Sequence, residues 1–262
     1  MIIHHLFVIF GFFKQSSNCS EMSCMNPLHS GDKGSTKMEN LYFFQSLLHK
    51  MIYRYCKLTK HQILYSTETF KETAIDEQII AKSGSIEIIS CTFSDFTTSS
   101  IIFSDSTSDI FVTKTLFRRS NSQDGFGLFN IDCNTALLDT NCITKCRSLN
   151  GINVGAISSK NEVAFNGTSI TKSSENFEEA GKSLLNIQTD KLIIFERNNI
   201  SHNQVIEGYS GPSLLSQYFC IVKYCTFGYS KTGKILKIKN AELSTVNIVH
   251  NNSTRELIEA YS

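Results

Sequence analysis

The chain has 262 residues, of which 41% are hydrophobic, and its 25 Lys and Arg against 24 Asp and Glu give a net charge of +1. That length and apolar content can form a substantial core, which excludes a wholly disordered protein, and the near-neutral balance speaks against nucleic acid or an anionic membrane as a bulk partner. Only 2 Pro and no Trp accompany many Ser, Thr, Asn and Ile residues, a composition that favours β-structure over an α/β enzyme.

Residues 1–48 are expected to form a separate N-terminal segment. Its apolar run from Ile2 to Phe13 is shorter than the roughly 20 residues that span a bilayer, so no transmembrane segment is predicted. The run has the length of a secretory signal core, but no Lys or Arg precedes it and no small-residue cleavage site follows. An export signal, a buried cap strand and a misassigned start all stay open.

From Met51 onward an eleven-residue pattern returns eight times: apolar-x-apolar-x-x-small-x-apolar-x-x-polar. Apolar residues two apart point to one face of a short strand, and the x-x step shifts the phase as a corner does. The fourth position falls at Leu58, Phe93, Phe117, Ile143, Ile170, Ile200, Phe227 and Ile248. The mean spacing of about 27 residues is typical of one solenoid coil per repeat.

A further apolar run, such as Ile101–Phe103, precedes most copies and predicts a third strand in each coil. We therefore predict that residues 49–262 form an all-β, right-handed parallel β-helix, a three-sided solenoid of about eight coils, capped by the N-terminal segment. The polar stretch 66–82 is predicted to be a loop. Because the pattern leaves the last coil open, we expect a chain truncated at its C-terminus or end-to-end self-association through this coil.

Four stretches carry a resemblance to known families. IEIISCTFSDF, LIIFERNNISHN and FCIVKYCTFGYS resemble repeats of right-handed β-helix surface proteins found in large protozoan families. GINVGAIS is similar to the GGAI element of chlamydial polymorphic outer-membrane proteins. The resemblance covers roughly Met51 to Ser262. It implies a non-enzymatic, adhesin-like scaffold, secreted or at the cell surface, that binds a glycan or protein ligand.

The alternative function is a carbohydrate-active β-helix enzyme, a polysaccharide lyase or glycoside hydrolase, or a degenerate relative of one. Such chemistry needs clustered acids. Asp105 and Asp132 are 27 residues apart and are expected to stack on adjacent coils. Two turn aspartates are more often solvated corner residues. With no other catalytic or ligand motif in the sequence, we predict no catalytic residue, no metal and no cofactor.

One outward position of the repeat predicts a row, or stripe, of side chains that could bind a ligand. The residue two after the fourth position alternates to the outside, and stacking would make it a column that is basic in its middle. The candidate ligand-binding residues are Arg119, Lys145, Lys172 and His202 in this column, together with Arg118, which sits beside Arg119. Such a stripe suits an acidic glycan or the acidic face of another protein. The simpler interpretation is that exposed charges discourage unwanted strand pairing.

The nine cysteines show no C-x-x-C spacing, which argues against a zinc site. Cys56, Cys91 and Cys225 share the third, inward position of the pattern and are predicted to be buried thiols. In an exported chain, Cys56 and Cys91 would be the pair within disulfide range.

Several asparagines have predicted roles. Asn198, Asn203 and Asn251 fall at corners, where an amide can bond the backbone of a neighbouring coil. The sequons at Asn166 and Asn199 point outward and are the predicted N-glycosylation sites of an extracellular or cell-surface protein.

Overall fold

The computed structural model describes residues 62–64, 68–123, 125–149, 151–174, 181–206, 208–230, 234–251 and 257–261. The predicted N-terminal segment 1–48 and the first predicted repeat copy, 51–61, lie outside these ranges. Every regular element in the described ranges is a β-strand, and no helix there could cross a membrane.

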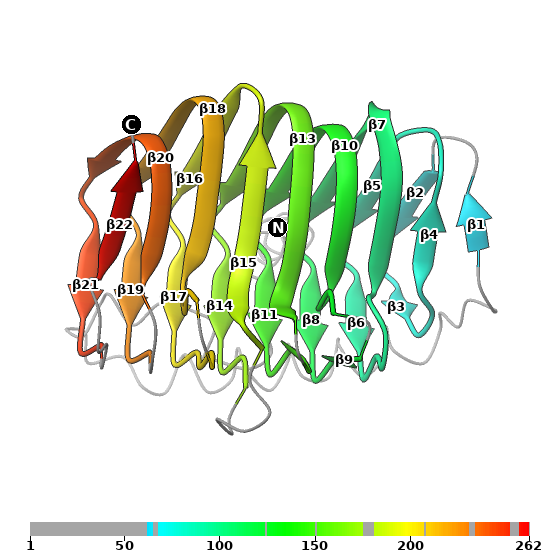
Figure 1. The fold of residues 1–262 in the computed structure, drawn as a ribbon. Helices are drawn as coiled ribbons and strands as arrows, with labels where there is room; N and C mark the ends of the chain where they lie inside the picture. Colours follow the sequence, from blue (N-terminus) through cyan, green and yellow to red (C-terminus); the bar gives the residue numbers. More distant parts are fainter. Residues whose placement is uncertain are drawn as a thin grey trace, which may run out of the picture.

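The strands pair in parallel and wind into a solenoid (Figure 1). The larger sheet has twelve strands. They are β1 (Gln62–Leu64), β2 (Glu68–Lys71), β4 (Ile79–Ala81), β5 (Ile86–Ile89), β7 (Ile101–Thr113), β10 (Phe129–Asp139), β13 (Ile152–Asn166), β15 (Ser183–Thr189), β16 (Leu192–Glu196), β18 (Pro212–Lys223), β20 (Leu236–Ser244) and β22 (Ile258–Tyr261).

A second sheet contains eight short strands. They are β3 (Ala74–Ile75), β6 (Thr92–Ser94), β8 (Leu116–Arg118), β11 (Cys142–Thr144), β14 (Ser169–Thr171), β17 (Asn199–Ser201), β19 (Thr226–Gly228) and β21 (Asn247–Val249). A small pair, β9 (Asn121–Ser122) and β12 (Arg147–Ser148), decorates one corner.

The fourth position of the repeat forms one interior column, which confirms the parallel β-helix. Consecutive members are register partners across the eight-stranded sheet, from Phe93 through Phe117 and onward to Ile248. Within the described residues, six of the eight short strands are paired on both sides, so six complete turns lie between two end coils. The predicted count of about eight coils is therefore slightly high.

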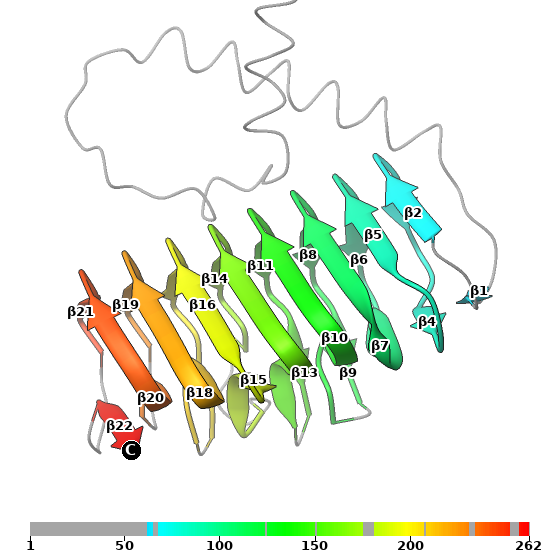
Figure 2. The ribbon, with the colours of Figure 1, turned by 90° about the horizontal axis from the view of Figure 1, so that it is seen from above.

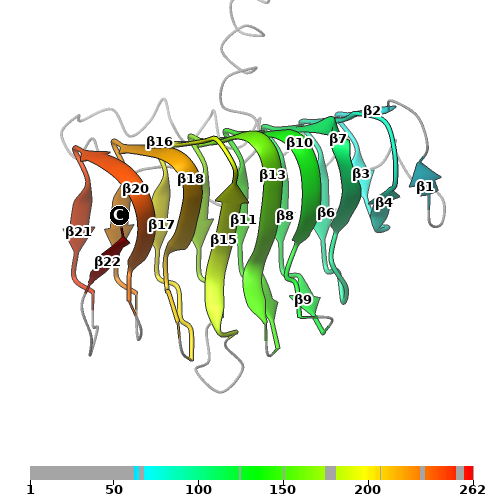
Figure 3. The same ribbon diagram turned by 45° about the horizontal axis from the view of Figure 1, so that its top comes forward.

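In several coils, the strand that carries the first two repeat anchors is continuous with the apolar run that precedes it. β7, β10, β13, β18 and β20 each run through a corner, where the register of most of these pairs shifts (Figure 3). The twelve-stranded sheet thus forms two sides of the coil, which we call the front face (the half around Ile101–Phe103) and the back face (the half around Ile110–Thr113). The eight-stranded sheet forms the third side.

The stretch 66–82 was predicted to be a loop, and that prediction is wrong. It contains β2, β3 and β4, which pair with β5, β6 and β7. Phe70, Thr73 and Ile75 fill the second, third and fourth repeat positions. Glu68 occupies the first position, where the pattern has an apolar residue. Because of this one polar side chain, the copy was not recognised as a repeat in the sequence. Because its neighbours still stack on the next coil, the strand forms despite the mismatch.

Aromatic stacking reinforces the core. The Phe93 and Phe117 rings are stacked with centroids 4.8 Å apart, and Phe117 meets Phe129 edge-on at 5.0 Å. Phe165 and Phe195 stack at 5.4 Å in a second group. All five rings are fully buried. Aromatic pairs of this geometry add stability beyond their buried area.

The predicted asparagine contacts are confirmed. Asn198 accepts a hydrogen bond from Thr168 N at 2.9 Å and donates to Phe165 O at 2.7 Å. Asn203 and Asn251 make the same two bonds to the preceding coil at the next corner. Each amide therefore satisfies one buried donor and one buried acceptor of its neighbour.

Candidate functional site

The predicted stripe forms a column at the corner that follows each short strand. We call it the corner column; its members are Asp95, Arg119, Lys145, Lys172, His202, Tyr229 and His250. All have a left-handed backbone with φ between 49° and 65°. From Asp95 to Tyr229, each backbone N–H donates to a carbonyl of the next coil, as Arg119 N does to Thr144 O at 3.1 Å. These ladder bonds offset the roughly 1–2 kcal/mol that a left-handed L-residue costs.

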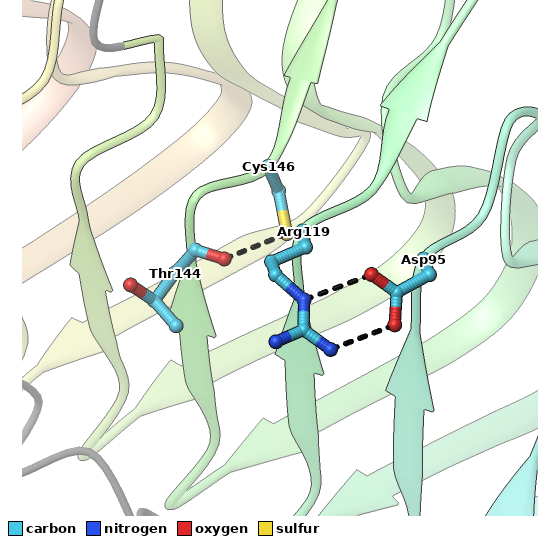
Figure 4. A network of polar contacts seen from close by, with 4 residues as sticks. All are labelled: Asp95, Arg119, Thr144 and Cys146. Carbon is cyan, nitrogen blue, oxygen red and sulfur yellow. Dashed lines mark hydrogen bonds and ion pairs between the residues drawn. The ribbon is translucent and has the colours of Figure 1, made fainter.

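An ion pair closes one end of the corner column. Arg119 donates through two nitrogens to the two carboxylate oxygens of Asp95, both at 2.8 Å (Figure 4). These hydrogen bonds and the guanidinium charge hold the pKa of Asp95 below its ordinary value. The side chains are 49% and 57% exposed, so the pair adds little to stability. The ion pair neutralises the charge of Arg119, and the other lysine or arginine side chains of the column are Lys145 and Lys172.

Rings occupy the other end of the column. His202 and Tyr229 stack at 4.9 Å with an interplanar angle of 9°, and Tyr229 stacks on His250 at 5.1 Å. The structure places Arg118 elsewhere: it lies on β8 between Ser94 and Thr144, on the face of the eight-stranded sheet. The five candidate ligand-binding residues therefore do not share one line, because Arg118 belongs to the neighbouring sheet face.

Asp105 and Asp132 do not stack, contrary to prediction. Asp105 is the register partner of Cys133, whereas Asp132 pairs with Ser104 and Ser158. The two halves of β7 are offset from β10 by different amounts, 28 residues at Ile101 and 26 at Ile110. The spacing of 27 that suggested stacking is the mean of these two offsets and applies to neither half.

Asp105 is hydrogen-bonded to several groups at the corner of β7. Its carboxylate accepts hydrogen bonds from Thr107 N and Oγ1, Ser108 Oγ and Gly84 N. These bonds, the hydroxyl bonds foremost, lower the pKa of Asp105 to about 2. It therefore holds the corner turn and the preceding coil together.

This environment predicts a pH effect. Since the folded pKa is depressed, Asp105 stabilises the fold above its unfolded pKa of about 3.9, and that contribution disappears as the pH falls through about 2. We expect Asp105→Asn to have a lower denaturation midpoint than the unmodified protein at pH 6 and a nearly equal one at pH 2. Urea titrations at both pH values measure the difference; a gap that persists at pH 2 would contradict the assignment.

The front face carries a hollow that the sequence did not reveal. We call it the notch; its volume is about 320 Å³. On its floor the small residues Ala156 and Ser158 lie on β13. Longer polar residues stand on the neighbouring strands, Asn130 and Asp132 on β10 and Asn186 and Gln188 on β15. Phe126 and Ile152 add an apolar side to the lining.

The polar groups of the notch are available to a ligand. Within the described ranges, the side chains of Asn130, Asp132, Asn186 and Gln188 make no hydrogen bond to another residue. Asp132 is the one acid among the lining residues, and the lining contains no cation. A possible sequence signal was the pair of small outward residues Ala156 and Ser158, but these positions lie between the repeat anchors, where the pattern sets no residue type.

Five of the described cysteines, Cys91, Cys133, Cys146, Cys220 and Cys225, are core residues, whereas Cys142 is buried with Leu116 in a separate small cluster. Cys91 and Cys225 are buried thiols in the third repeat position, as predicted, and Cys91 donates to Ile89 O. Cys91 is not in a disulfide, and its proposed partner Cys56 lies outside the described residues. Cys142 is disulfide-bonded. Burial raises the pKa of Cys133 to about 12, which makes the thiol unreactive. No group of metal-binding side chains occurs in the described ranges.

The two predicted glycosylation sites are partly exposed. Asn166 ends β13 on the back face, and its Oδ1 accepts a hydrogen bond from Glu196 N at 3.3 Å. Asn199 begins β17 on the eight-stranded sheet. Their glycosylation stays a prediction.

By fold and by surface, the chain is a parallel β-helix repeat protein with a hollowed front face and a charged corner column. No protein-family model, no curated protein and no solved structure matches it. The likeness to protozoan and chlamydial surface proteins therefore rests on the repeat alone.

Proposed function

We propose that the protein is a non-enzymatic, adhesin-like β-helix scaffold, secreted or at the cell surface, that binds a glycan in the notch. The observation that carries this proposal is the set of four long polar side chains, unpaired within the described residues, around a floor of small ones. These side chains face water, and in a hollow a ligand's hydroxyl groups can replace the water bound to them.

The dimensions of the notch suit a sugar ring. Its walls stand on β10 and β15, two strand spacings or about 9.6 Å apart. Subtracting van der Waals radii leaves a gap of roughly 6 Å, which admits a pyranose ring edge-on between the two walls. Phe126, whose side chain is partly exposed, offers an apolar surface to the C–H face of the ring.

The chemistry of the notch favours neutral sugars. Amides supply paired donors and acceptors to hydroxyl groups, and the carboxylate of Asp132 accepts strong hydrogen bonds from vicinal hydroxyls. A uronic acid or sulfated sugar would bring its charge beside Asp132 with no lining cation to balance it.

Acidic ligands would instead suit the corner column. Lys145 and Lys172 occupy consecutive coils, and no described carboxylate lies within ion-pair distance of Lys172. We propose this pair as a secondary contact for an acidic segment of the glycan or of its carrier protein, with attraction that weakens as salt increases.

The carbohydrate-active enzyme is the less favoured alternative. Glycoside hydrolysis commonly needs two carboxyl groups about 5–10 Å apart across the scissile bond. Asp132 lines the notch without a second acid there, and Asp105 is committed to the corner turn. The disulfide of Cys142 supports export, because disulfides persist in oxidising compartments.

A glycan array followed by calorimetric titration of the best neutral oligosaccharide tests the proposal. Ala156→Leu fills the notch and Asn186→Ala removes one wall amide, so each is expected to weaken binding at least tenfold, or about 1.4 kcal/mol. Ser104→Ala, an exposed change on the same face outside the notch, serves as the matched control and should leave the affinity unchanged.

Three outcomes separate the possibilities. Loss of binding in the two notch variants alone supports the proposal. Loss only in Lys145→Glu with Lys172→Glu moves the site to the corner column. Shortened sugar products during prolonged incubation, absent with Asp132→Asn, would establish the enzyme instead.

A further inference from the structure

The back face carries an unusual outward column. In a solenoid the outward positions are expected to be polar, yet on five consecutive coils the residue between the first two repeat anchors is apolar. We call this column the apolar stripe; its members are Phe111, Leu137, Ala164, Ile194 and Ile221. Each is the register partner of the next, so together they form a continuous line along the solenoid axis.

The apolar stripe is separate from the core. Its residues are partly exposed, while their inward neighbours, such as Val112 and Phe195, are fully buried. Leu192 and Phe219, register partners in the adjacent outward column, widen it at one end. Figure 2 looks onto the face that carries it, where β7, β10, β13, β16 and β18 lie side by side. A contiguous, partly exposed apolar line of this kind is a candidate interaction site.

Carboxylates frame the apolar stripe. Glu87 and Glu242 occupy the same column just beyond its two ends. Asp139 and Glu196 lie in the outward column on one side, and Glu162 lies in the column on the other. Lys223 stands next to Glu196 but is paired with Glu242 at 2.9 Å. Lys71 lies in the same outward column as Asp139, three coils away and beyond the end of the apolar stripe. Lys114, Lys160, Lys191 and Arg197 sit farther out, at the corners.

The spacing of the apolar stripe fits a helix. Its members repeat at one strand spacing, about 4.8 Å, and an α-helix laid along the axis presents an apolar position every turn, about 5.4 Å. Over the four steps the two repeats diverge by only about 2.4 Å, so a helix of about 13 residues keeps one apolar contact per coil. Because the stripe is only one or two residues wide, the flanks of that helix lie above the carboxylates.

We propose that the apolar stripe docks an amphipathic helix of a partner protein, with apolar residues on one face and Lys or Arg along both edges. A second copy of the chain fits poorly, because face-to-face pairing brings Glu162, Asp139 and Glu196 of both copies together. An anionic lipid surface is disfavoured by the same carboxylates.

The test uses the full chain produced in bacteria, so that Asn166 carries no glycan, and a fluorescent 16-residue helical peptide with a leucine face and lysine edges. Anisotropy titration is expected to show binding, whereas a peptide with the same leucine face and glutamate edges should bind at least tenfold more weakly. Ile194→Thr should weaken the lysine-edged peptide about tenfold. Glu162→Gln combined with Glu196→Gln should flatten the salt dependence of its affinity.

Matched controls lie on other faces: Ile102→Thr replaces a partly exposed isoleucine on the front face, and Glu72→Gln removes an exposed acid at a corner. Both should leave the affinity unchanged. A photo-crosslinking residue at position 164 identifies the occupant by mass spectrometry. Crosslinks to the peptide support the proposal, while crosslinks to residues 1–61 or to a second copy overturn it, as does equal binding of both peptides.

Discussion

Replacing Phe117 with alanine is expected to lower the free energy of unfolding by about 4 kcal/mol, because the change removes a fully buried ring and leaves a cavity. The ring contacts Phe93 above it and Phe129 beside it, so both neighbours lose their aromatic partner. Guanidinium unfolding followed by circular dichroism measures the loss.

The apolar stripe supplies the control. Phe111→Ala removes the same ring from the same region of the chain but from a partly exposed site, and should cost about 1 kcal/mol. Equal losses in the two variants would mean that the inward and outward columns are misassigned.

Replacing Asn198 with alanine is expected to cost about 3 kcal/mol, although little apolar contact is lost. The change leaves Thr168 N and Phe165 O without partners inside the solenoid, and each unsatisfied buried group costs about 1–3 kcal/mol. Hydrogen exchange should show faster opening at the amide of Thr168, which denaturant unfolding alone would not resolve.

Asn199 is the matched control for this prediction, since it is the same residue type one position along the chain. It is partly exposed, and Asn199→Ala in unglycosylated protein should change stability by less than about 0.5 kcal/mol. A neutral Asn198→Ala would refute the role of the amide as a bridge between coils.

The interior of this fold could be predicted from sequence because burial constrains it. Phe93, Phe117 and Ile143 recur at one repeat position since each must fill the same space above its neighbour. The spacing of these anchors fixed the register of the eight-stranded sheet. The same logic identified the bridging role of Asn198, because an amide at that inward corner can satisfy backbone groups of the neighbouring coil. Other residue types, such as Cys91 and Val246, occupy the same position in other coils.

The exterior could be predicted only in part. The corner column follows the anchors at a fixed distance, so its line from Asp95 to His250 was found. Asp105 and Asp132 were misplaced because two extra residues in the corner of β7 change the offset between its halves. The notch and the apolar stripe depend on outward residues such as Ala156 and Ile194. Solvent imposes no single residue type there, so only the coordinates bring them together.

The left-handed corners have a consequence for how this molecule can change. From Asp95 to Tyr229, each corner residue points its side chain outward while its backbone N–H is hydrogen-bonded to the next coil. Acid, base, imidazole and phenol all occupy the same geometry, at Asp95, Lys145, His202 and Tyr229. The solenoid thus presents a row of substitutable side chains about 4.8 Å apart. Each of these residues can be replaced by another type, which changes the surface chemistry while the fold stays the same.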